Sequence, residues 1–308
     1  MEDLKTLTLR NKTRFLELFT NLGYGHLTSA FSWAEIAAVL YYEIMTLPAD
    51  GLPDYVSDRM VVSKGHGVGI LFPIFEDLGW LSKAQIENIL RPGGDSSKIN
   101  KMFYPGFDFY GGSLGIGIGM AVGMAKGDKL SSSPKKTYCL VGDAECYEGA
   151  VWEAVNFAGH HKLNNLTVVV DRNNLGCSDF TEHMLKLEPF RERWQSFGWE
   201  VHETDGHDIQ QLYDTFVACR QSETSAPKCI IAHTKKGHGL DYLVDKPLMH
   251  GYIPKKPEDI ARAFRPSGFP FPRSPARRIS APTPGPATEL PPGPPTPARV
   301  RTQSRSEP

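Results

Sequence analysis

The chain has 308 residues, of which 40% are hydrophobic, and its formal net charge is −1 at pH 7. This length allows one large domain or two small ones, with enough chain to bury a substantial core. The near-neutral charge gives no reason to expect nucleic acid or a membrane surface as a partner, and no apolar run approaches the ~18 residues of a membrane span.

The N-terminal part of the chain predicts two helices followed by a strand. Apolar residues recur at nearly helical spacing over 4–22, and 31–42 has the pattern of a second helix. Either Ser29 or Ser32 is expected to cap that second helix, because serine hydroxyls accept hydrogen bonds from first-turn amides. The short apolar run at 59–63 is predicted to be a strand.

The next stretch predicts three helices and one long loop. Helical patterns occupy 68–78 and 82–90, and the residues at 91–112, rich in Gly, Pro and Ser, are expected to form a loop. A further helix is predicted over 114–126. Its glycines recur every four residues on one face, which permits close approach of a neighbouring element: Gly115, Gly119 and Gly123. Their spacing does not match the dinucleotide fingerprint, which argues against a nicotinamide dehydrogenase.

A strand–helix–strand unit in the middle of the chain is the strongest functional signal. Strands are predicted at 137–141 and 166–170, with a helix at 145–163 between them. Such crossovers make the two strands parallel, so Asp143 and Asn173 should lie at the same carboxyl edge of the sheet, where ligands of α/β folds bind. A carboxylate and an amide oxygen suit Mg²⁺, which takes few protein ligands together with phosphate oxygens. The residues therefore predict a metal–diphosphate anchor.

The remaining patterns complete an α/β fold. A strand at 200–203, a helix at 209–221 and a strand at 228–234 follow in order. Alternating units of this kind predict a parallel β-sheet with helices on both faces. We expect this body to occupy residues 1–264.

The composition changes after residue 264. Residues 265–308 contain 13 prolines and seven arginines but only two glutamates. Such a segment cannot bury enough apolar surface to offset its ordering entropy, so we expect a disordered tail. A proline-rich segment that docks on a partner is the alternative.

Five cysteines without a Cys-x-x-Cys pair favour a compartment that keeps thiols reduced. The N-terminus carries charges throughout and lacks the apolar core of a secretory signal. A cytoplasmic protein is therefore expected.

Three stretches of sequence carry a family resemblance: 142–149 (GDAECYEG), 159–166 (GHHKLNNL) and 171–175 (DRNNL). In this order they resemble the thiamine-diphosphate motif of transketolases. The likeness runs from about residue 10 to about residue 260. It looks like the N-terminal, diphosphate-binding section alone, as in transketolases that are split over two chains. The resemblance implies the thiamine-diphosphate-binding fold, with thiamine diphosphate and Mg²⁺ as cofactors.

The resemblance also implies which residues hold the cofactor. Asp143, Asn173 and the Leu175 carbonyl would bind the metal. The predicted cofactor contacts lie in several segments of the chain: His66, Gly112, Ser113, Leu114, Gly142, Ala144, Glu145, Asn173 and His250. The family usually has glycine at position 144, so alanine would be strained there if φ were positive.

Three further residues are expected to take part in catalysis. His26 and His66 lie in segments that resemble those whose histidines face the thiazolium ring and the substrate hydroxyls, and histidine suits proton transfer near neutral pH. Glu148 matches the glutamate that contacts its counterpart across the transketolase dimer and links the two active sites. The alternative for Glu148 is a glutamate favoured by the helix dipole.

Two departures from the family affect the expected function. Many transketolases have Gly-His-Pro where this chain has Ser97, Lys98 and Ile99, so one substrate-facing histidine is missing. The pyrimidine-binding domain, whose glutamate activates thiamine, is also missing from the chain. We therefore expect the isolated chain to be inactive and to need a partner that resembles the C-terminal section. Two copies of each would form a dimer of heterodimers, a heterotetramer.

The expected function is transfer of a two-carbon ketol unit from a ketose to an aldehyde, both small molecules. One alternative is a thiamine-diphosphate-dependent carboligase or acyl transferase subunit of a specialised pathway, suggested by Lys98 and Ala144. Another is a truncated, non-catalytic chain that binds the cofactor.

Overall fold

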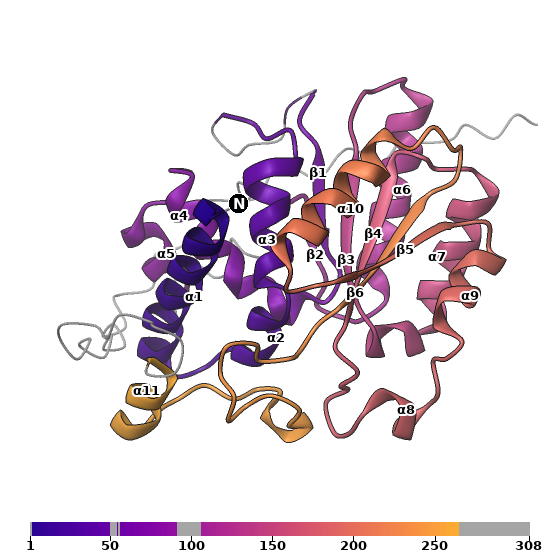
Figure 1. Ribbon diagram of the computed structural model, residues 1–308. Coiled ribbons are helices and arrows are strands. Elements are labelled where there is room, and N and C mark those ends of the chain that lie inside the picture. The colour runs from indigo at the N-terminus through magenta and orange to yellow at the C-terminus, as the bar shows by residue number, and fades with distance from the viewer. Residues whose placement is uncertain (1, 50–53, 55, 91–105, 265–308) are drawn as a thin grey trace, which may run out of the picture.

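The computed structural model describes residues 2–49, 54, 56–90 and 106–264 (Figure 1). The expected tail at 265–308 and the departure at 97–99 lie outside these described residues. Within the described part, no helix is both long and apolar enough to cross a membrane.

A parallel sheet of six strands forms the centre of the molecule (Figure 1). Its order is β2-β1-β3-β4-β6-β5, and every neighbouring pair is parallel. The strands are β1 (Arg59–Val62), β2 (Phe109–Tyr110), β3 (Thr137–Gly142), β4 (Leu166–Arg172), β5 (Glu200–Asp205) and β6 (Lys228–His233). The predicted α/β fold with a parallel sheet is confirmed.

Helices cover both faces of this sheet. The α-helices are α1 (Glu2–Leu22), α2 (Leu27–Ser32), α3 (Ala34–Val39), α4 (Leu71–Asp77), α5 (Lys83–Leu90), α6 (Ile116–Leu130), α7 (Gly149–His160), α8 (Thr181–Met184), α9 (Phe190–Ser196), α10 (Ile209–Gln221) and α11 (Pro257–Phe264). Short 3₁₀ or π turns are η1 (Leu40–Ile44), η2 (Gly65–Ile70), η4 (Ala144–Tyr147) and η5 (Pro247–Met249).

The strands are apolar on both sides and separate two hydrophobic cores. On β3, Tyr138 and Leu140 pack with α1, α3 and α10, whereas Cys139 and Val141 pack with α6, α7 and α9. This alternation follows from the two-residue period of a strand. Burial on both faces explains why the strand sequences are continuous apolar runs.

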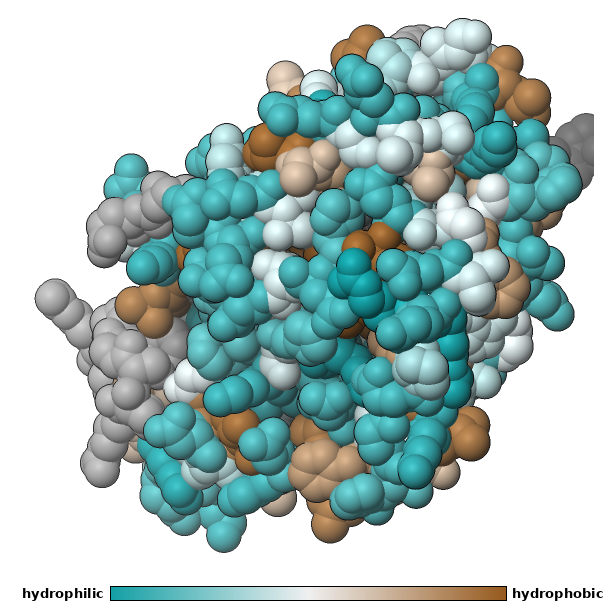
Figure 2. Space-filling view, turned by 45° about the vertical axis from the view of Figure 1, so that its right-hand side comes forward, coloured by the Kyte–Doolittle hydropathy of each residue, from teal (hydrophilic) through white to brown (hydrophobic). Residues whose placement is uncertain are grey.

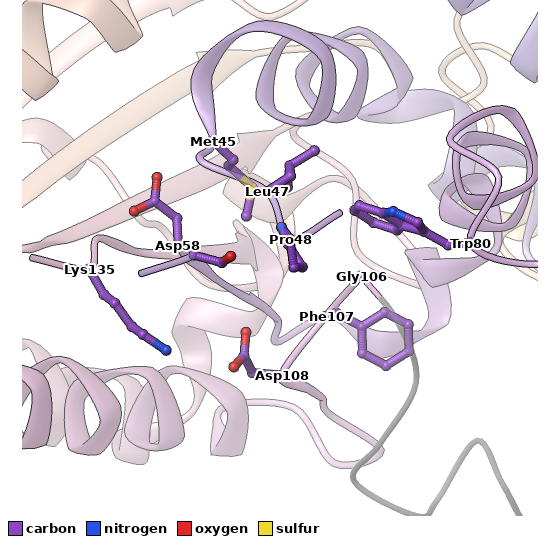
Figure 3. Close-up of a pocket in the computed structure, with 10 residues that line it drawn as sticks. Met45, Leu47, Pro48, Asp58, Trp80, Gly106, Phe107, Asp108 and Lys135 are labelled. Carbon is purple, nitrogen blue, oxygen red and sulfur yellow. The ribbon is translucent and has the colours of Figure 1, made fainter. Parts of the chain in front are cut away.

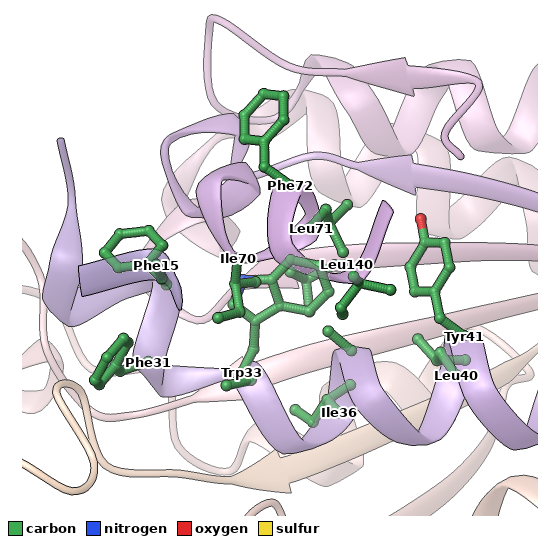
Figure 4. Packing of buried hydrophobic residues seen from close by; sticks show 14 of the residues in the cluster. Phe15, Phe31, Trp33, Ile36, Leu40, Tyr41, Ile70, Leu71, Phe72 and Leu140 are labelled. Atoms are coloured by element: carbon green, nitrogen blue, oxygen red, sulfur yellow. The ribbon is translucent and has the colours of Figure 1, made fainter. Parts of the chain in front are cut away.

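Trp33 occupies the centre of the first core (Figure 4). Its ring lies among Ile70, Leu71 and Leu140, and its indole nitrogen donates to the Gly67 carbonyl at 2.9 Å. The hydrogen bond ties the helical layer to η2, which follows β1. Packing in this core therefore fixes the position of the chain that carries His66.

The structure corrects the helix predicted over 31–42 and its caps. The helix is broken at Trp33, whose φ of −124° and ψ of 17° are not helical. Neither Ser29 nor Ser32 is an N-cap: α2 starts after His26, and both serines lie within it. The Ser32 hydroxyl instead donates to the Asp171 carboxylate at 2.8 Å. Tertiary bonds at this position override local helix preference.

The helix predicted over 145–163 is also divided. Residue Glu148 has extended backbone (φ −71°, ψ 128°) and caps α7, so it precedes that helix instead of lying in its first turns. Within the predicted loop 91–112, residues 109–110 form the edge strand β2. Short elements such as β2 and α8 leave too few residues for a periodic signal.

Candidate active site

The carboxyl ends of four adjacent strands supply the polar side chains of the site. Gly142 of β3 is paired in register with Asp171 of β4, so the residues that follow each of them are neighbours. Lys64 follows β1, and Thr234 follows β6 on the other side of β4. Residues far apart in sequence thus meet at one edge, as expected for a parallel sheet.

Asp171 is the fully buried centre of this edge. Its carboxylate is bonded to the Lys64 ammonium and accepts hydrogen bonds from the hydroxyls of Ser32 and Thr234. Burial opposes ionisation, but Lys64 and the hydroxyl donors outweigh it and hold the pKa of Asp171 below its ordinary value. Neither Asp171 nor Lys64 was predicted as a site residue, although both stand inside the sequence motifs that point to this edge.

The Asn173 amide has one orientation that satisfies its neighbours. Its nitrogen donates to the Ser32 hydroxyl at 3.1 Å and to the Asp171 carboxylate at 3.3 Å. Its oxygen accepts from the Leu175 backbone amide at 3.1 Å. Since the nitrogen is held by the buried cluster, the oxygen is directed to the turn at 173–175.

The Asp143 carboxylate reaches the same turn. One oxygen accepts from the Ala144 amide at 2.7 Å and the other from the Asn174 amide at 2.6 Å. Burial, followed by the nearby Asp171, raises the pKa of Asp143 to about 6, and Arg172 acts in the opposite direction. A buried carboxylate with a raised pKa lacks full charge compensation and would be stabilised by a cation. Its position beside an amide oxygen fits a small, hard cation such as Mg²⁺.

Arg172 is a further residue that was not predicted from the sequence. Its buried guanidinium lies 3.5 Å from Asp143 and donates to the Thr181 hydroxyl at 3.0 Å. It also bonds Glu182 at 3.0 Å and Glu188 at 2.9 Å. Arg172 therefore connects the end of β4 to the segment that contains α8.

Glu145 joins three segments through its side chain. One carboxylate oxygen accepts from the Ser63 hydroxyl at 2.5 Å and the Gly115 amide at 2.8 Å. The other accepts from the Gly142 amide at 2.9 Å. The Gly142 amide, predicted to contact the cofactor, thus has a carboxylate partner in this structure.

The glycine-rich stretch before α6 packs closely against the end of β1. A Cβ on Gly111 would lie 2.4 Å from the Ser63 carbonyl oxygen, so no side chain fits there. Gly112 instead borders open space. The exposed residues of this stretch lie near Glu148, because a Cβ on Gly115 would approach the Glu148 Cβ to 2.7 Å: Ser113 and Leu114.

Ala144 does not carry the strain that was considered for it. The described non-glycine residues with positive φ are Ser132, Lys162, Asn174 and Asp245. Alanine is therefore accommodated at position 144, and the left-handed residue of the site is Asn174, whose φ is 61°.

Three histidines from separate segments form a cluster beside this edge. The ring centroids of His26 and His66 are 5.3 Å apart, and His250 lies 5.2 Å from the first and 4.8 Å from the second. Burial and nearby lysines lower all three pKa values, that of His66 to about 2 and that of His250 to about 4. Near neutral pH the rings are uncharged, so each can donate one hydrogen bond and accept another.

Lys236 is a buried cation that no sequence motif identified. Its ammonium lies 2.9 Å from the His250 ring and 3.4 Å from the Gly176 carbonyl oxygen. Burial and the charge of Lys64 lower the pKa of Lys236 to about 8. Two buried ammonium groups beside three uncharged histidines are suited to bind an anionic group.

A crevice at the other end of the sheet has too little space for a cofactor (Figure 3). It lies between Trp80, Phe107 and Lys135, near the start of β1 and β3, and encloses about 20 Å³. This volume suits one water molecule. The site at the carboxyl ends of the strands therefore remains the stronger candidate.

Comparisons with known proteins agree with this geometry. Residues 9–275 match the family model described as transketolase, thiamine diphosphate binding domain. One of the two subunits named for apulose-4-phosphate transketolase, from Phocaeicola vulgatus, is 33% identical over 254 residues, which cover 82% of this chain and 90% of that protein. Transketolase from Rattus norvegicus is 35% identical over 254 residues, but this match covers only 40% of its length.

Solved structures show the same fold. Transketolase from Campylobacter jejuni subsp. jejuni superposes with a TM-score of 0.73 at 26% identity, covering 85% of this chain and 43% of that one. Transketolase from Leishmania mexicana gives a TM-score of 0.75 at 23% identity, covering 86% and 41%. The chain thus spans less than half the length of these transketolases.

Proposed function

This chain belongs to the transketolase family, as its N-terminal, thiamine-diphosphate-binding section, and we propose that it is one subunit of a split transketolase. The complex would transfer a two-carbon ketol unit from a ketose to an aldehyde. The observation that carries the proposal is the meeting of Asp143 and Asn173 at one turn, beside three uncharged histidines and two buried lysines.

The donor set supports Mg²⁺ at this turn. Asp143, Asn173 and the Leu175 carbonyl would hold the ion, and phosphate oxygens and water would complete its octahedral shell. Lys236 and His250 would face the diphosphate from the opposite segment. Bound thiamine diphosphate would supply the nucleophilic carbon and stabilise the ketol carbanion.

The chain's own residues would bind and orient the reactants. Gly112 borders open space that could receive the cofactor ring, with Ser113 and Leu114 next to it. His26 and His66 would hold substrate hydroxyls and move their protons, since uncharged imidazole can both accept and donate a proton. Gly142, Ala144 and Glu145 would shape the diphosphate end, with the Gly142 amide exchanging Glu145 for a phosphate oxygen.

A groove between α6 and α7 supports assembly with other subunits. It has a volume of about 370 Å³ and is lined by Gly119, Gly123 and Phe157. Apolar side chains are exposed along it, including Ile116 at 49% and Phe157 at 44%. Glu148 is exposed near one end of the groove, as a residue that meets its counterpart would be.

Other surfaces give less support for a partner. On the face seen in Figure 2, hydrophilic residues dominate and hydrophobic ones occur in small separate groups. We propose that a chain like the transketolase C-terminal section and a second copy of this chain cover the α6–α7 groove. The result would be a dimer of heterodimers.

Two similar proteins are subunits of transketolases named for apulose 4-phosphate, and these names favour a phosphorylated ketose as donor. Five free cysteines, four of them buried, are suited to a reducing cytosol. We therefore place the complex in the cytoplasm.

Calorimetry on the full chain tests the proposal directly. Thiamine diphosphate should bind with Mg²⁺ and lose at least ~100-fold in affinity in Asp143→Asn, since even outer-shell partners of a metal contribute ten- to hundredfold. The exposed Asp214 on α10 provides the matched control, Asp214→Asn, which should bind normally. Equal binding by both variants would refute the assignment, and ketol transfer by the chain alone would refute the need for a partner.

A further inference from the structure

A buried polar cluster lies behind the site, outside the residues assigned to the cofactor. Glu35 of α3 is bonded to the Lys12 ammonium at 2.5 Å and to the His207 Nδ1 at 3.0 Å. His238 stacks on His207 with ring centroids 3.6 Å apart and lies 3.4 Å from Glu35. Burial opposes ionisation of Glu35, but Lys12 and the two histidines lower its pKa well below the ordinary value.

The hydrogen bonds of His207 determine its tautomer. The Lys235 backbone amide donates to the His207 Nε2 at 2.7 Å, and a backbone N–H can only donate. The Nε2 atom must then be unprotonated, so Nδ1 carries the proton that is donated to Glu35. A ring in this state has no free lone pair at Nδ1 for a metal, and the Lys12 ammonium already compensates Glu35.

We propose that Glu35 and His207 form a positioning relay, which anchors the Lys235 backbone and thereby places Lys236 at the cofactor site. This inference rests on the proposed function, in which Lys236 faces the diphosphate. The relay would act through the backbone: Glu35 orients the imidazole, the imidazole holds the Lys235 amide, and the next side chain points to His250.

The loop around Lys236 is held on both sides. The Thr234 amide donates to the Arg172 carbonyl at 3.1 Å, and the Gly237 amide donates to the Thr28 carbonyl at 2.9 Å. Between them, the Lys235 amide bonds to His207. Gly237 has a φ of 83°, a conformation that lets the chain turn back directly after Lys236. Loss of the His207 bond would free the Lys236 backbone on its N-terminal side.

Two substitutions separate the halves of the relay. In His207→Asn the amide can replace Nδ1 and still donate to Glu35, but it cannot reach the Lys235 amide. In His207→Gln the amide oxygen can replace Nε2 and accept from Lys235 without the bond to Glu35. His233→Gln is the matched control, because His233 is exposed and pairs with Glu203 at 2.8 Å.

Hydrogen exchange over 235–239 and calorimetry with thiamine diphosphate and Mg²⁺ give the readout on the full chain. In His207→Asn, exchange should accelerate and affinity should fall by a factor of about three to ten, the range expected for one hydrogen bond. His207→Gln should recover most of both properties, and His233→Gln should match the wild type. Equal losses in the Asn and Gln variants, or no loss in either, would overturn the relay.

A measurement on the unmodified chain covers the case in which a variant fails to fold. ¹⁵N NMR of labelled histidine should show His207 with its proton on Nδ1. A proton on Nε2, or stoichiometric Zn²⁺ binding at Glu35 and His207, would contradict the relay. If the wild type binds no thiamine diphosphate, the proposed function fails, whereas the exchange and NMR results still decide whether His207 anchors Lys235.

Discussion

Arg172 lies between the expected metal ligand Asp143 and the segment that follows β4. Its side chain is only 3% exposed, and it also lies over the Phe190 ring at 5.2 Å. Arg172→Met would leave the buried Asp143 without this cation and release Glu182. Breaking a buried pair in this way costs about 3 kcal/mol or more in the free energy of unfolding.

Denaturant unfolding would measure this loss, and Mg²⁺ affinity should fall with it. Arg191→Met provides the comparison, because Arg191 is 41% exposed and pairs with an exposed Glu203. An exposed pair contributes no more than about 1 kcal/mol. If both variants unfold at the same denaturant concentration, Arg172 does not have the role inferred from its burial.

Lys236 makes cofactor binding depend on pH. Its pKa is lowered to about 8 from an ordinary 10.5, so between these values the unfolded chain holds a proton that the folded chain has lost. This group's contribution to stability therefore rises with pH across that window. Affinity for an anionic diphosphate should instead fall as pH rises above about 8, because the anion favours the ammonium form.

Calorimetry in two buffers of different ionisation enthalpy would detect this proton. Proton uptake on binding should appear near pH 8 in the wild type and disappear in Lys236→Met. A pH profile that is the same for both proteins would show that Lys236 does not sense the diphosphate.

At the scale of elements, α6 has two glycine faces with opposite requirements. A Cβ on Gly117 would lie 2.5 Å from the Ser63 Cα, whereas a Cβ on Gly123 would meet nothing within 4 Å. Gly117→Ala should therefore disturb the end of β1 and lower the melting temperature. Gly123→Ala should raise it slightly, since alanine is favoured over glycine in a helix by about 1 kcal/mol.

The same pair of variants tests the α6–α7 groove as an assembly surface. Gly123→Ala would add a methyl group to the groove and should weaken association in analytical ultracentrifugation, despite its more stable fold. Full association by this variant, mixed with a partner chain like the C-terminal section, would exclude tight packing at Gly123.

Periodicity alone predicted the long elements well, because α1, α6 and α10 bury one face and the strands are apolar on both sides. It failed where tertiary bonds decide the backbone. Trp33 leaves the helical conformation and bonds to Gly67, and Glu148 adopts an extended conformation before α7. Neither residue type signals such a break by itself.

At the scale of the whole molecule, the predicted meeting of strand ends follows from parallel topology. Asp143 and Asn173 were placed on one edge by the crossover rule, and the register of Gly142 with Asp171 confirms that edge. Lys236 and His207 were not predicted, since their roles depend on loops that approach each other only after folding. Whether these residues bind a cofactor remains a prediction.

The assembly is also a property of the whole molecule. The match covers 90% of the Phocaeicola vulgatus subunit but only 40% of the Rattus norvegicus transketolase, which supports a second chain for the remaining section. Activity should therefore appear only when both chains are mixed.

The most direct measurement is anomalous diffraction from crystals of the full chain with thiamine diphosphate and Mn²⁺ in place of Mg²⁺. We predict one strong peak in contact with the Asp143 carboxylate, the Asn173 amide oxygen and the Leu175 carbonyl, with the diphosphate beside Lys236. A peak elsewhere, or none while the Asp143 and Asn173 side chains point apart, would contradict the proposed cofactor site.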